Sequence, residues 1–298
     1  MEKDYLRDIK IVDKMKKDGV HISFEVFPPK DGYNYAEIME SVDEIAKFKP
    51  AFMSVTYGAG GGTSKNTVAI ASHIRNDLGI NALAHFTCVS STKDEIGQYL
   101  DQLKNAGIRN VLALRGDIPK GVEDPFPGGL RHASELIEEI KKHGDFCIGA
   151  ACYPEGHTEC VNQREDIKYL KEKVDMGVDF LTAQMCFVNS AFYSFMYRIR
   201  EAGITVPVLP GIMPITNAAR MKRSCELSGA EMPRRIRSII DRFGDNPDAM
   251  IQAGIAYATE QIVDFISNGI DNIHIYTMNK PEVAEALMNN LSSIATII

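Results

Sequence analysis

Several features that define common classes of protein are missing from this sequence. Lys and Arg total 33 against 40 Asp and Glu, and the formal net charge of −7 argues against a surface that binds nucleic acid. No segment approaches the roughly 20 consecutive apolar residues that a membrane-spanning helix requires. The sequence therefore predicts a protein that acts neither on nucleic acid nor in a membrane.

The cysteines and the N-terminal segment argue against three further classes. The six cysteines form no C-x-x-C pair and follow no small-domain disulfide spacing, so we interpret them as buried thiols. His157 and Cys160 have helical spacing, but no nearby pair completes a tetrahedral metal site, and we expect no metal. Residues 1–17 are charged and lack the apolar core of a signal peptide, which indicates a cytoplasmic protein.

What is present is a regular alternation of short apolar runs and longer amphipathic segments, without a Ser/Gly/Pro-rich linker. This alternation is typical of repeated β/α units. The predicted strands are His21–Pro28, Phe52–Gly58, Ala82–Cys88, Val111–Asp117, Phe146–Tyr153, Phe180–Phe187, Val206–Pro210 and Asn272–Met278. Since eight strands close a barrel, we predict a single (β/α)8 TIM barrel over residues 1–298, with residues 1–20 as a helical extension.

The amphipathic segments between these strands are predicted helices, and several are followed by the glycine that commonly ends a helix. They are Tyr35–Lys47, Lys65–Leu78, Lys93–Asn105, His132–His143, Asn162–Met176, Ser190–Glu201 and Asn217–Ser228. A further pair, Glu231–Phe243 and Pro247–Asn268, predicts an extra helix before the last strand. A doubly wound open sheet shows the same alternation, but its dinucleotide fingerprint is missing after the first strand.

Polar side chains stand at the C-terminal ends of the predicted strands, where the active site of a β/α barrel lies. Glu25 ends the first strand among apolar neighbours, which favour the protonated form of a carboxyl group and suit a general acid. A Glu paired with a structural Arg is an equally good interpretation. His85, in the third strand, resembles the hydrogen-bonded core histidines that are common in barrels.

Two further strand ends indicate a planar ligand. Arg115 and Asp117 share one strand face, and Gly116 between them leaves room for a ring to approach. A salt bridge at the strand end is the alternative interpretation of this pair. Gln184 offers both a donor and an acceptor, which suits a heterocycle with a mixed hydrogen-bonding edge.

Taken in order, these strand ends resemble one known family. The segments are FEVFPP (24–29), SVTYGAGG (54–61), AHFTC (84–88), LALRGD (112–117), YPEGH (153–157), KEKVD (171–175) and Gln184. Together they resemble the methylenetetrahydrofolate reductases, over Ile22–Lys280. The resemblance implies a (β/α)8 fold, noncovalent FAD, and reduction of a tetrahydrofolate-bound methylene group to methyl with electrons from NAD(P)H. NADH is the expected donor, and NADPH stays open because no ribose-reading motif is visible.

The resemblance also implies roles for individual residues. Glu25 corresponds to the general acid that opens the methylene bridge, and Asp117 to a carboxylate near both flavin and pterin. Gln184 corresponds to an amide that meets folate or nicotinamide, and Lys280 to a folate-side position. The positions implied to contact the flavin are Thr56, Tyr57, Ala59, His85, Arg115, Gly116, Asp117, Ala133, Tyr153, His157, Asp166 and Lys173.

The chain departs from the better-known bacterial members at several positions. Ala218, Tyr169 and Glu172 stand where those enzymes have Phe, Asn and Arg, and Lys280 replaces an Arg. These departures leave FMN open as the flavin and an electron-transfer partner subunit open as the donor. Two other functions also stay open, a flavin-free barrel lyase and a non-catalytic folate-binding subunit. A homo-oligomer is open as the assembly state.

Overall fold

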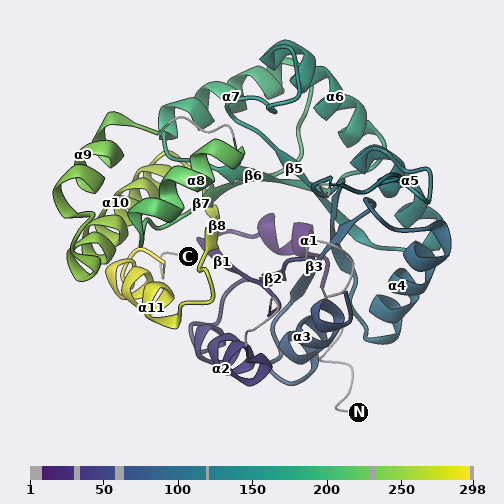
Figure 1. Cartoon of the computed structure of the whole chain (residues 1–298), viewed down its shortest axis with the longest axis horizontal. Helices are drawn as coiled ribbons and strands as arrows, with labels where there is room; N and C mark the ends of the chain where they lie inside the picture. Colours follow the sequence, from purple (N-terminus) through teal and green to yellow (C-terminus); the bar gives the residue numbers. More distant parts are fainter. Residues whose placement is uncertain (1–8, 30–33, 58–63, 119–120, 229–231, 296–298) are drawn as a thin grey trace.

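Eight parallel strands form the centre of the structure and close into one barrel, in chain order (Figure 1). The computed structural model describes residues 9–29, 34–57, 64–118, 121–228 and 232–295. The strands are β1 (His21–Val26), β2 (Met53–Val55), β3 (Ala82–Thr87), β4 (Asn110–Leu114), β5 (Cys147–Cys152), β6 (Phe180–Met185), β7 (Val208–Ile212) and β8 (Asn272–Tyr276). Because β8 pairs with β1 in parallel, the predicted (β/α)8 barrel is confirmed.

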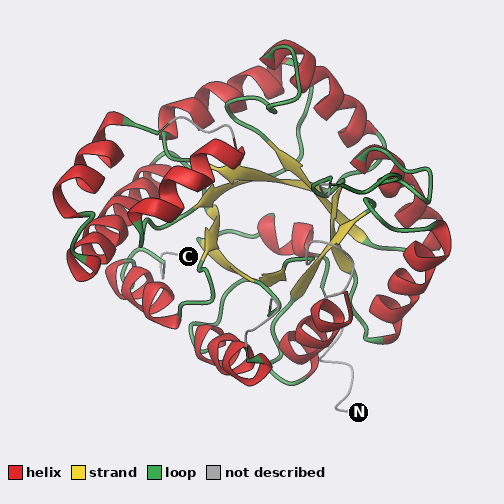
Figure 2. Ribbon diagram, in the orientation of Figure 1, coloured by secondary structure: helices red, strands yellow, loops and turns green. Residues whose placement is uncertain are grey.

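Most of the helices form a ring around the barrel (Figure 2). They are α1 (Ile11–Met15), α2 (Tyr35–Ala46), α3 (Ser64–Asn76), α4 (Lys93–Asn105), α5 (Ala133–His143), α6 (Gln163–Asp175), α7 (Asn189–Glu201), α8 (Ala218–Ser228), α9 (Arg234–Phe243), α10 (Pro247–Ser267) and α11 (Pro281–Asn290). Helices α8, α9 and α10 all precede β8, so the predicted extra helical segment before the last strand is confirmed. Helix α11 lies beyond the last helix predicted from the sequence.

Polar caps fix where several of these helices begin. The Thr92 side chain accepts a hydrogen bond from the Glu95 backbone N–H at the start of α4. At the start of α6, the Asn162 side chain accepts one from the Glu165 N–H at 2.9 Å. Such caps satisfy backbone donors that have no partner inside the helix. The cap at Asn162 matters for function because α6 and the segment before it carry side chains of the candidate site.

One end of the barrel is closed by the short helix α1. Its buried residues Ile11, Val12 and Met15 pack against side chains from the beginnings of the strands, including Phe52. The Ile11 N–H donates a hydrogen bond of 2.8 Å to the side chain of Asn110, the first residue of β4. This closed end leaves the opposite end of the barrel, where the strands finish, for ligands.

Other expectations can be compared with the described residues. Seven strands are shorter than predicted, and the run Phe52–Gly58 contributes only Met53–Val55 to the barrel. Strand β7 has the predicted length, but it lies at Val208–Ile212, two residues beyond the predicted Val206–Pro210. Five of the six cysteines are buried, as predicted, whereas Cys160 is only partly buried. Within the described ranges, no helix is both long and apolar enough to cross a bilayer. The predicted extension over residues 1–20 is helical at Ile11–Met15, and residues 1–8 are not described.

Candidate active site

A cavity of about 370 Å³ lies at the C-terminal ends of the strands. We call it the inner cavity. Its lining includes three residues that the sequence analysis selected for chemistry or substrate binding, namely Glu25, Asp117 and Gln184. It also contains the expected flavin-contact residues Thr56, Tyr57, His85, Arg115, Gly116, Tyr153 and His157. Side chains from distant parts of the sequence are thus gathered around one space.

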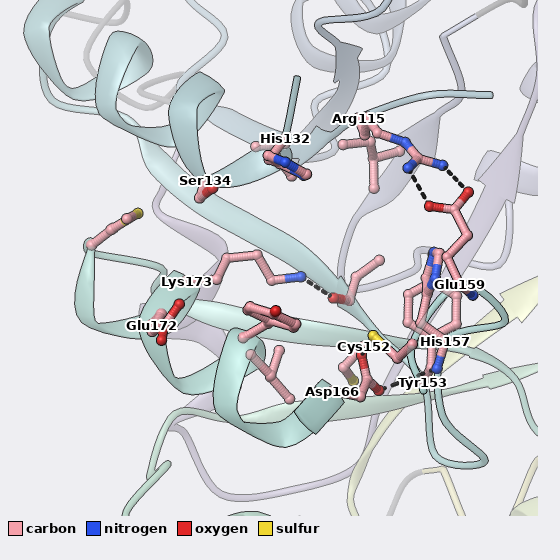
Figure 3. Close-up of a pocket in the computed structure, with 18 residues that line it drawn as sticks. Arg115, His132, Ser134, Cys152, Tyr153, His157, Glu159, Asp166, Glu172 and Lys173 are labelled. Atoms are coloured by element: carbon pink, nitrogen blue, oxygen red, sulfur yellow. Dashed lines mark hydrogen bonds and ion pairs between the residues drawn. The ribbon is translucent and has the colours of Figure 1, made fainter. Parts of the chain in front are cut away.

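A second cavity, of about 490 Å³, lies beside the first between strands β4 and β5 and helices α5 and α6 (Figure 3). We call it the outer cavity. Its lining includes the expected residues Ala133, Asp166 and Lys173. The two cavities share the lining residues Leu114, Arg115, Ala151, Tyr153 and His157. The two spaces therefore adjoin and can accommodate one elongated ligand.

Glu25 is held in a largely buried setting at the floor of the inner cavity. Its side chain is 17% exposed, and Oε2 lies 3.6 Å from His85 Nε2 and 3.7 Å from His274 Nε2. The ionisable side chains within 4 Å of its carboxylate in the described structure are thus imidazoles, which replaces the alternative of a structural Arg. Burial lowers the pKa of His85 to about 4, although Glu25 acts in the opposite direction. His85 is therefore neutral near pH 7.

His85 differs from the hydrogen-bonded core histidine that a barrel commonly contains. The residue is 5% exposed, and its Nε2 has no hydrogen-bond partner within the described structure. A buried polar atom without a partner is costly unless a ligand or water satisfies it. Because His85 lines the inner cavity, a ligand group in that space is a natural partner.

Arg115 forms an ion pair with Glu159 rather than with Asp117. Its two terminal nitrogens donate to the two Glu159 carboxylate oxygens at 2.6 and 2.7 Å (Figure 3). These hydrogen bonds raise the pKa of Arg115 and lower the pKa of Glu159. The same planar fork suits a phosphate group, since arginine binds carboxylates and phosphates in a bidentate manner.

Gly116 is required by the protein's own packing. Its φ is +89°, and a Cβ added there would lie 2.5 Å from a Val89 methyl carbon and 2.9 Å from the Thr87 Cβ. Both the positive φ and this close approach favour glycine. Gly116 thus serves the packing of the protein itself, and it also lines the inner cavity, where a ligand is expected to approach.

Two side chains on α6 organise the outer cavity. Lys173 Nζ donates to the Ala151 carbonyl at 2.6 Å, and burial lowers the pKa of this lysine. Asp166 accepts hydrogen bonds from the His157 N–H and the Cys160 thiol, which ties the segment before α6 to the helix. Within the described residues, no cluster of three or more His, Cys, Asp or Glu suits a metal ion.

Three of the sequence-based positions fall elsewhere. Lys280 is the N-cap residue of α11 and is absent from the described lining of both cavities. Ala218, at the start of α8, is likewise absent, and its Cβ faces Gly244 beyond α9. Ala59 lies outside the described residues. The folate-side role of Lys280 therefore stays a prediction.

Several lining residues were not identified from the sequence. Tyr276 and Thr182 line the inner cavity, and His132, Ser134 and Glu159 line the outer one. Tyr276 lies opposite Glu25 in the register of β8 and β1, so strand alternation could have indicated it. Glu159 carried no such signal, because it lies outside any strand and its role depends on the position of Arg115.

Comparison with known proteins agrees with this geometry. Residues 10–292 match the model of the methylenetetrahydrofolate reductase family. The protein of Arabidopsis thaliana named methylenetetrahydrofolate reductase (NADH) 1 is 34% identical over 304 residues, covering 96% of this chain and 51% of that protein. The chain thus spans about half the length of this plant relative.

A bacterial relative matches over most of its own length. The 5,10-methylenetetrahydrofolate reductase of Escherichia coli (strain K12) is 32% identical over 272 residues, covering 91% of this chain and 90% of that protein. The fold is shared with an uncharacterized protein from Clostridium thermocellum that binds two copies of 5-methyl-5,6,7,8-tetrahydrofolic acid, with a TM-score of 0.66, 15% identity, and coverage of 97% of this chain and 99% of that one. The family match over nearly the whole chain and the bacterial relative of similar extent show that this chain belongs to the methylenetetrahydrofolate reductase family.

Proposed function

We propose that this protein reduces 5,10-methylenetetrahydrofolate to 5-methyltetrahydrofolate, using a bound flavin that takes electrons from NADH. The observation that carries the proposal is that Glu25, Asp117 and Gln184 line one cavity. An acid, an acceptor and an amide are what a pterin and its one-carbon bridge require. The flavin, when bound, accepts and delivers the hydride.

Each of these residues has a distinct task in the proposal. Glu25 supplies the proton that opens the methylene bridge, and its burial excludes water from competing for that proton. The carboxylate of Asp117 accepts hydrogen bonds from the pterin amino edge. The amide of Gln184, whose Oε1 accepts from the Met185 N–H at 3.0 Å, leaves its NH₂ group for the ligand.

The donor set fits a flavin, and the two adjoining cavities favour FAD over FMN. The inner cavity is lined by His85, whose Nε2 has no hydrogen-bond partner within the described structure. In the outer cavity, Arg115, Lys173 and the N-terminus of α5 at Ala133 are suited to phosphate groups. The shorter FMN would leave much of the outer cavity unfilled, whereas FAD is long enough to occupy both.

Direct reduction by NADH is supported by the walls of the inner cavity. The Ala218 departure lies against Gly244, and Tyr57, Tyr153 and Tyr276 provide aromatic surface around the space instead. The name of the Arabidopsis thaliana relative includes NADH. The alternative is that a partner subunit supplies the electrons. Whether the isolated chain reacts with NADH distinguishes these two donors.

Anaerobic absorbance spectroscopy tests the proposal. The purified protein is expected to be yellow, to bleach with NADH, and to regain colour when 5,10-methylenetetrahydrofolate is added. Chromatography of the released flavin then distinguishes FAD from FMN. A colourless protein that cannot be reconstituted with either flavin would contradict the proposal. Bleaching by dithionite but not by NADH or NADPH would favour the partner subunit.

A further inference from the structure

Three buried polar residues lie on the strands next to Glu25. Ser23 and Ser54 are fully buried, and His274 is 1% exposed. The pairing of β1 with β8 places Ser23 opposite His274, and the pairing of β1 with β2 places Glu25 opposite Ser54. A buried polar group inside a barrel destabilises the fold unless it has a hydrogen-bond partner. The contacts among these three residues therefore indicate which atoms donate and which accept.

The contacts of Ser23 determine which nitrogen of His274 carries a hydrogen. Ser23 Oγ lies 2.9 Å from the Ile273 carbonyl oxygen and 2.8 Å from His274 Nδ1. The carbonyl can only accept, so the single hydroxyl hydrogen of Ser23 is donated to it. Ser23 Oγ then accepts from His274, which places the ring hydrogen on Nδ1.

It follows that Nε2 of a neutral His274 is an acceptor. This nitrogen lies 3.2 Å from Ser54 Oγ, which can donate to it, and 3.7 Å from Glu25 Oε2. Nε2 has one lone pair, which Ser54 occupies, so His274 acts on Glu25 through the field of its ring, whose negative side faces a carboxyl group that is either neutral or charged. The electrostatic difference between these states is large where water is excluded.

We infer that His274 is a positioning residue whose tautomer, fixed by Ser23, turns the electron-rich Nε2 of its ring towards Glu25, the proposed acid. This inference rests on the proposed role of Glu25. The rigid stacking of His274 on Phe52, with 5.6 Å between ring centroids and 13° between planes, holds the imidazole in this orientation. The sequence places Ser23 and His274 outside the motifs that indicated the site.

The other ionisable groups around Glu25 leave this role to His274. His85 on β3 lies 3.6 Å away, and its burial keeps it neutral, with a pKa of about 4. Tyr276 on β8 is paired with Glu25 in register, and burial raises its pKa well above the usual value. The side chain facing Glu25 from β2 is Ser54, which carries no charge.

The tautomer can be measured directly by NMR of protein labelled with ¹⁵N in its seven histidines. The His274 signal is identified by its loss in His274→Gln. We expect the Nδ1–H pattern at pH 7 in the wild type, and an Nε2–H or mixed pattern in Ser23→Ala. An Nε2–H or imidazolium pattern in the wild type would overturn the inference. This measurement needs no folate turnover, so it can be interpreted even if the proposed function fails.

The consequence for chemistry is measured by following reoxidation of the reduced flavin by 5,10-methylenetetrahydrofolate across pH. In Ser23→Ala, an Nε2–H can donate to the Glu25 carboxylate, so the loss of rate at high pH should move down by about one pH unit. Asn110→Ala removes another fully buried polar side chain, at the α1 end of the barrel, and should destabilise the protein without moving the profile. A Ser23→Ala profile that superimposes on the wild type, or an equal shift in Asn110→Ala, would refute the inference.

Discussion

The inner and outer cavities share a wall but differ in how they are built. The inner cavity is formed mainly by strand ends, and its candidate acid, Glu25, has a side chain that is only 17% exposed. The outer cavity depends on two helices and a connecting segment, and its carboxylate Glu159 is 57% exposed. Two departures from the better-known bacterial members, Tyr169 and Glu172, line the outer cavity and not the inner one. Under the proposed function, this difference assigns the chemistry to the strand ends and the affinity for the cofactor to the helices and the connecting segment.

Among the substitutions that test this difference between the two cavities, the largest effect is expected at Glu25. Glu25→Gln keeps the shape of the side chain but removes its proton, so folate reduction should fall by about 10²-fold or more. Flavin binding and flavin reduction by NADH should persist. Stopped-flow measurement of the two half-reactions separates these steps, with Glu44→Gln, an exposed carboxylate on α2, as the control. A near-normal folate step in Glu25→Gln would break the assignment of chemistry to the inner cavity.

Arg115→Ala tests the outer cavity, where we expect the loss to fall on flavin binding rather than on folate reduction. Hydrogen bonds to charged groups contribute about 1.5–3 kcal/mol, so flavin affinity should fall by about 10- to 100-fold. At saturating flavin, the folate step should change far less than it does in Glu25→Gln. Binding titrations provide the measurement, and Arg109→Ala, which breaks the ion pair with Asp145, is the matched control. Unchanged flavin affinity in Arg115→Ala would show that the outer cavity does not bind the phosphates.

The burial of the inner cavity should also appear in the pH dependence of stability. Since His85 has a folded-state pKa of about 4 against 6.5 when unfolded, its contribution is present above pH 6.5 and lost as pH falls towards 4. The loss between pH 7.5 and 5 should be about 2 kcal/mol. Urea unfolding gives the free energy of unfolding of the wild type and of His85→Gln at both pH values. The difference between the two proteins should change by this amount between pH 7.5 and 5.

His73, on the outside of the barrel, should behave in the opposite way. Burial lowers its pKa, but hydrogen bonds with Asp43 and Asp77 outweigh that effect and raise the pKa overall. Its contribution is therefore present below pH 6.5 and lost as pH rises through the raised value. The same unfolding experiment on His73→Gln serves as the control, and equal signs for His73 and His85 would contradict the buried setting of the inner cavity.

The smallest effect is expected at Glu159. Its carboxylate occupies the guanidinium fork of Arg115 that a phosphate would use, so Glu159→Gln should favour flavin binding. Exposed ion pairs contribute about 0.2–1 kcal/mol, which limits the gain in affinity to about fivefold. Glu260→Gln removes a similarly exposed carboxylate paired with Arg235 and should leave affinity unchanged. Weaker flavin binding by Glu159→Gln would mean that Glu159 assists the ligand rather than competing with it.

The barrel could be predicted from the sequence because its strands are short apolar runs separated by amphipathic helices. The ends of the strands were less predictable. The polar residues that follow an apolar run, such as those after Val55, lie outside the hydrogen bonding between strands. Helix α11 was missed although Pro281 at its first turn is a recognised start signal.

The candidate site was predicted where a polar residue ends an apolar strand, as at Glu25 and Gln184. The contacts made by Ser23 and His274 were not predicted, because they depend on the register of two strands about 250 residues apart, and no local pattern records a register. Glu159 was missed for a related reason, since only the folded chain brings it to Arg115. The sequence thus indicated the residue types of the site better than their pairings.

The wall shared by the two cavities has a consequence for residence time. A ligand held in the outer cavity keeps its other end close to the inner one, at an effective concentration in about the millimolar range. If its inner end detaches, it rebinds before the outer contacts around Arg115 and Lys173 are lost. A molecule that reaches only the inner cavity has no such tether and leaves as soon as its contacts break. Adjoining cavities of this kind therefore separate a resident cofactor from substrates that exchange at every turnover.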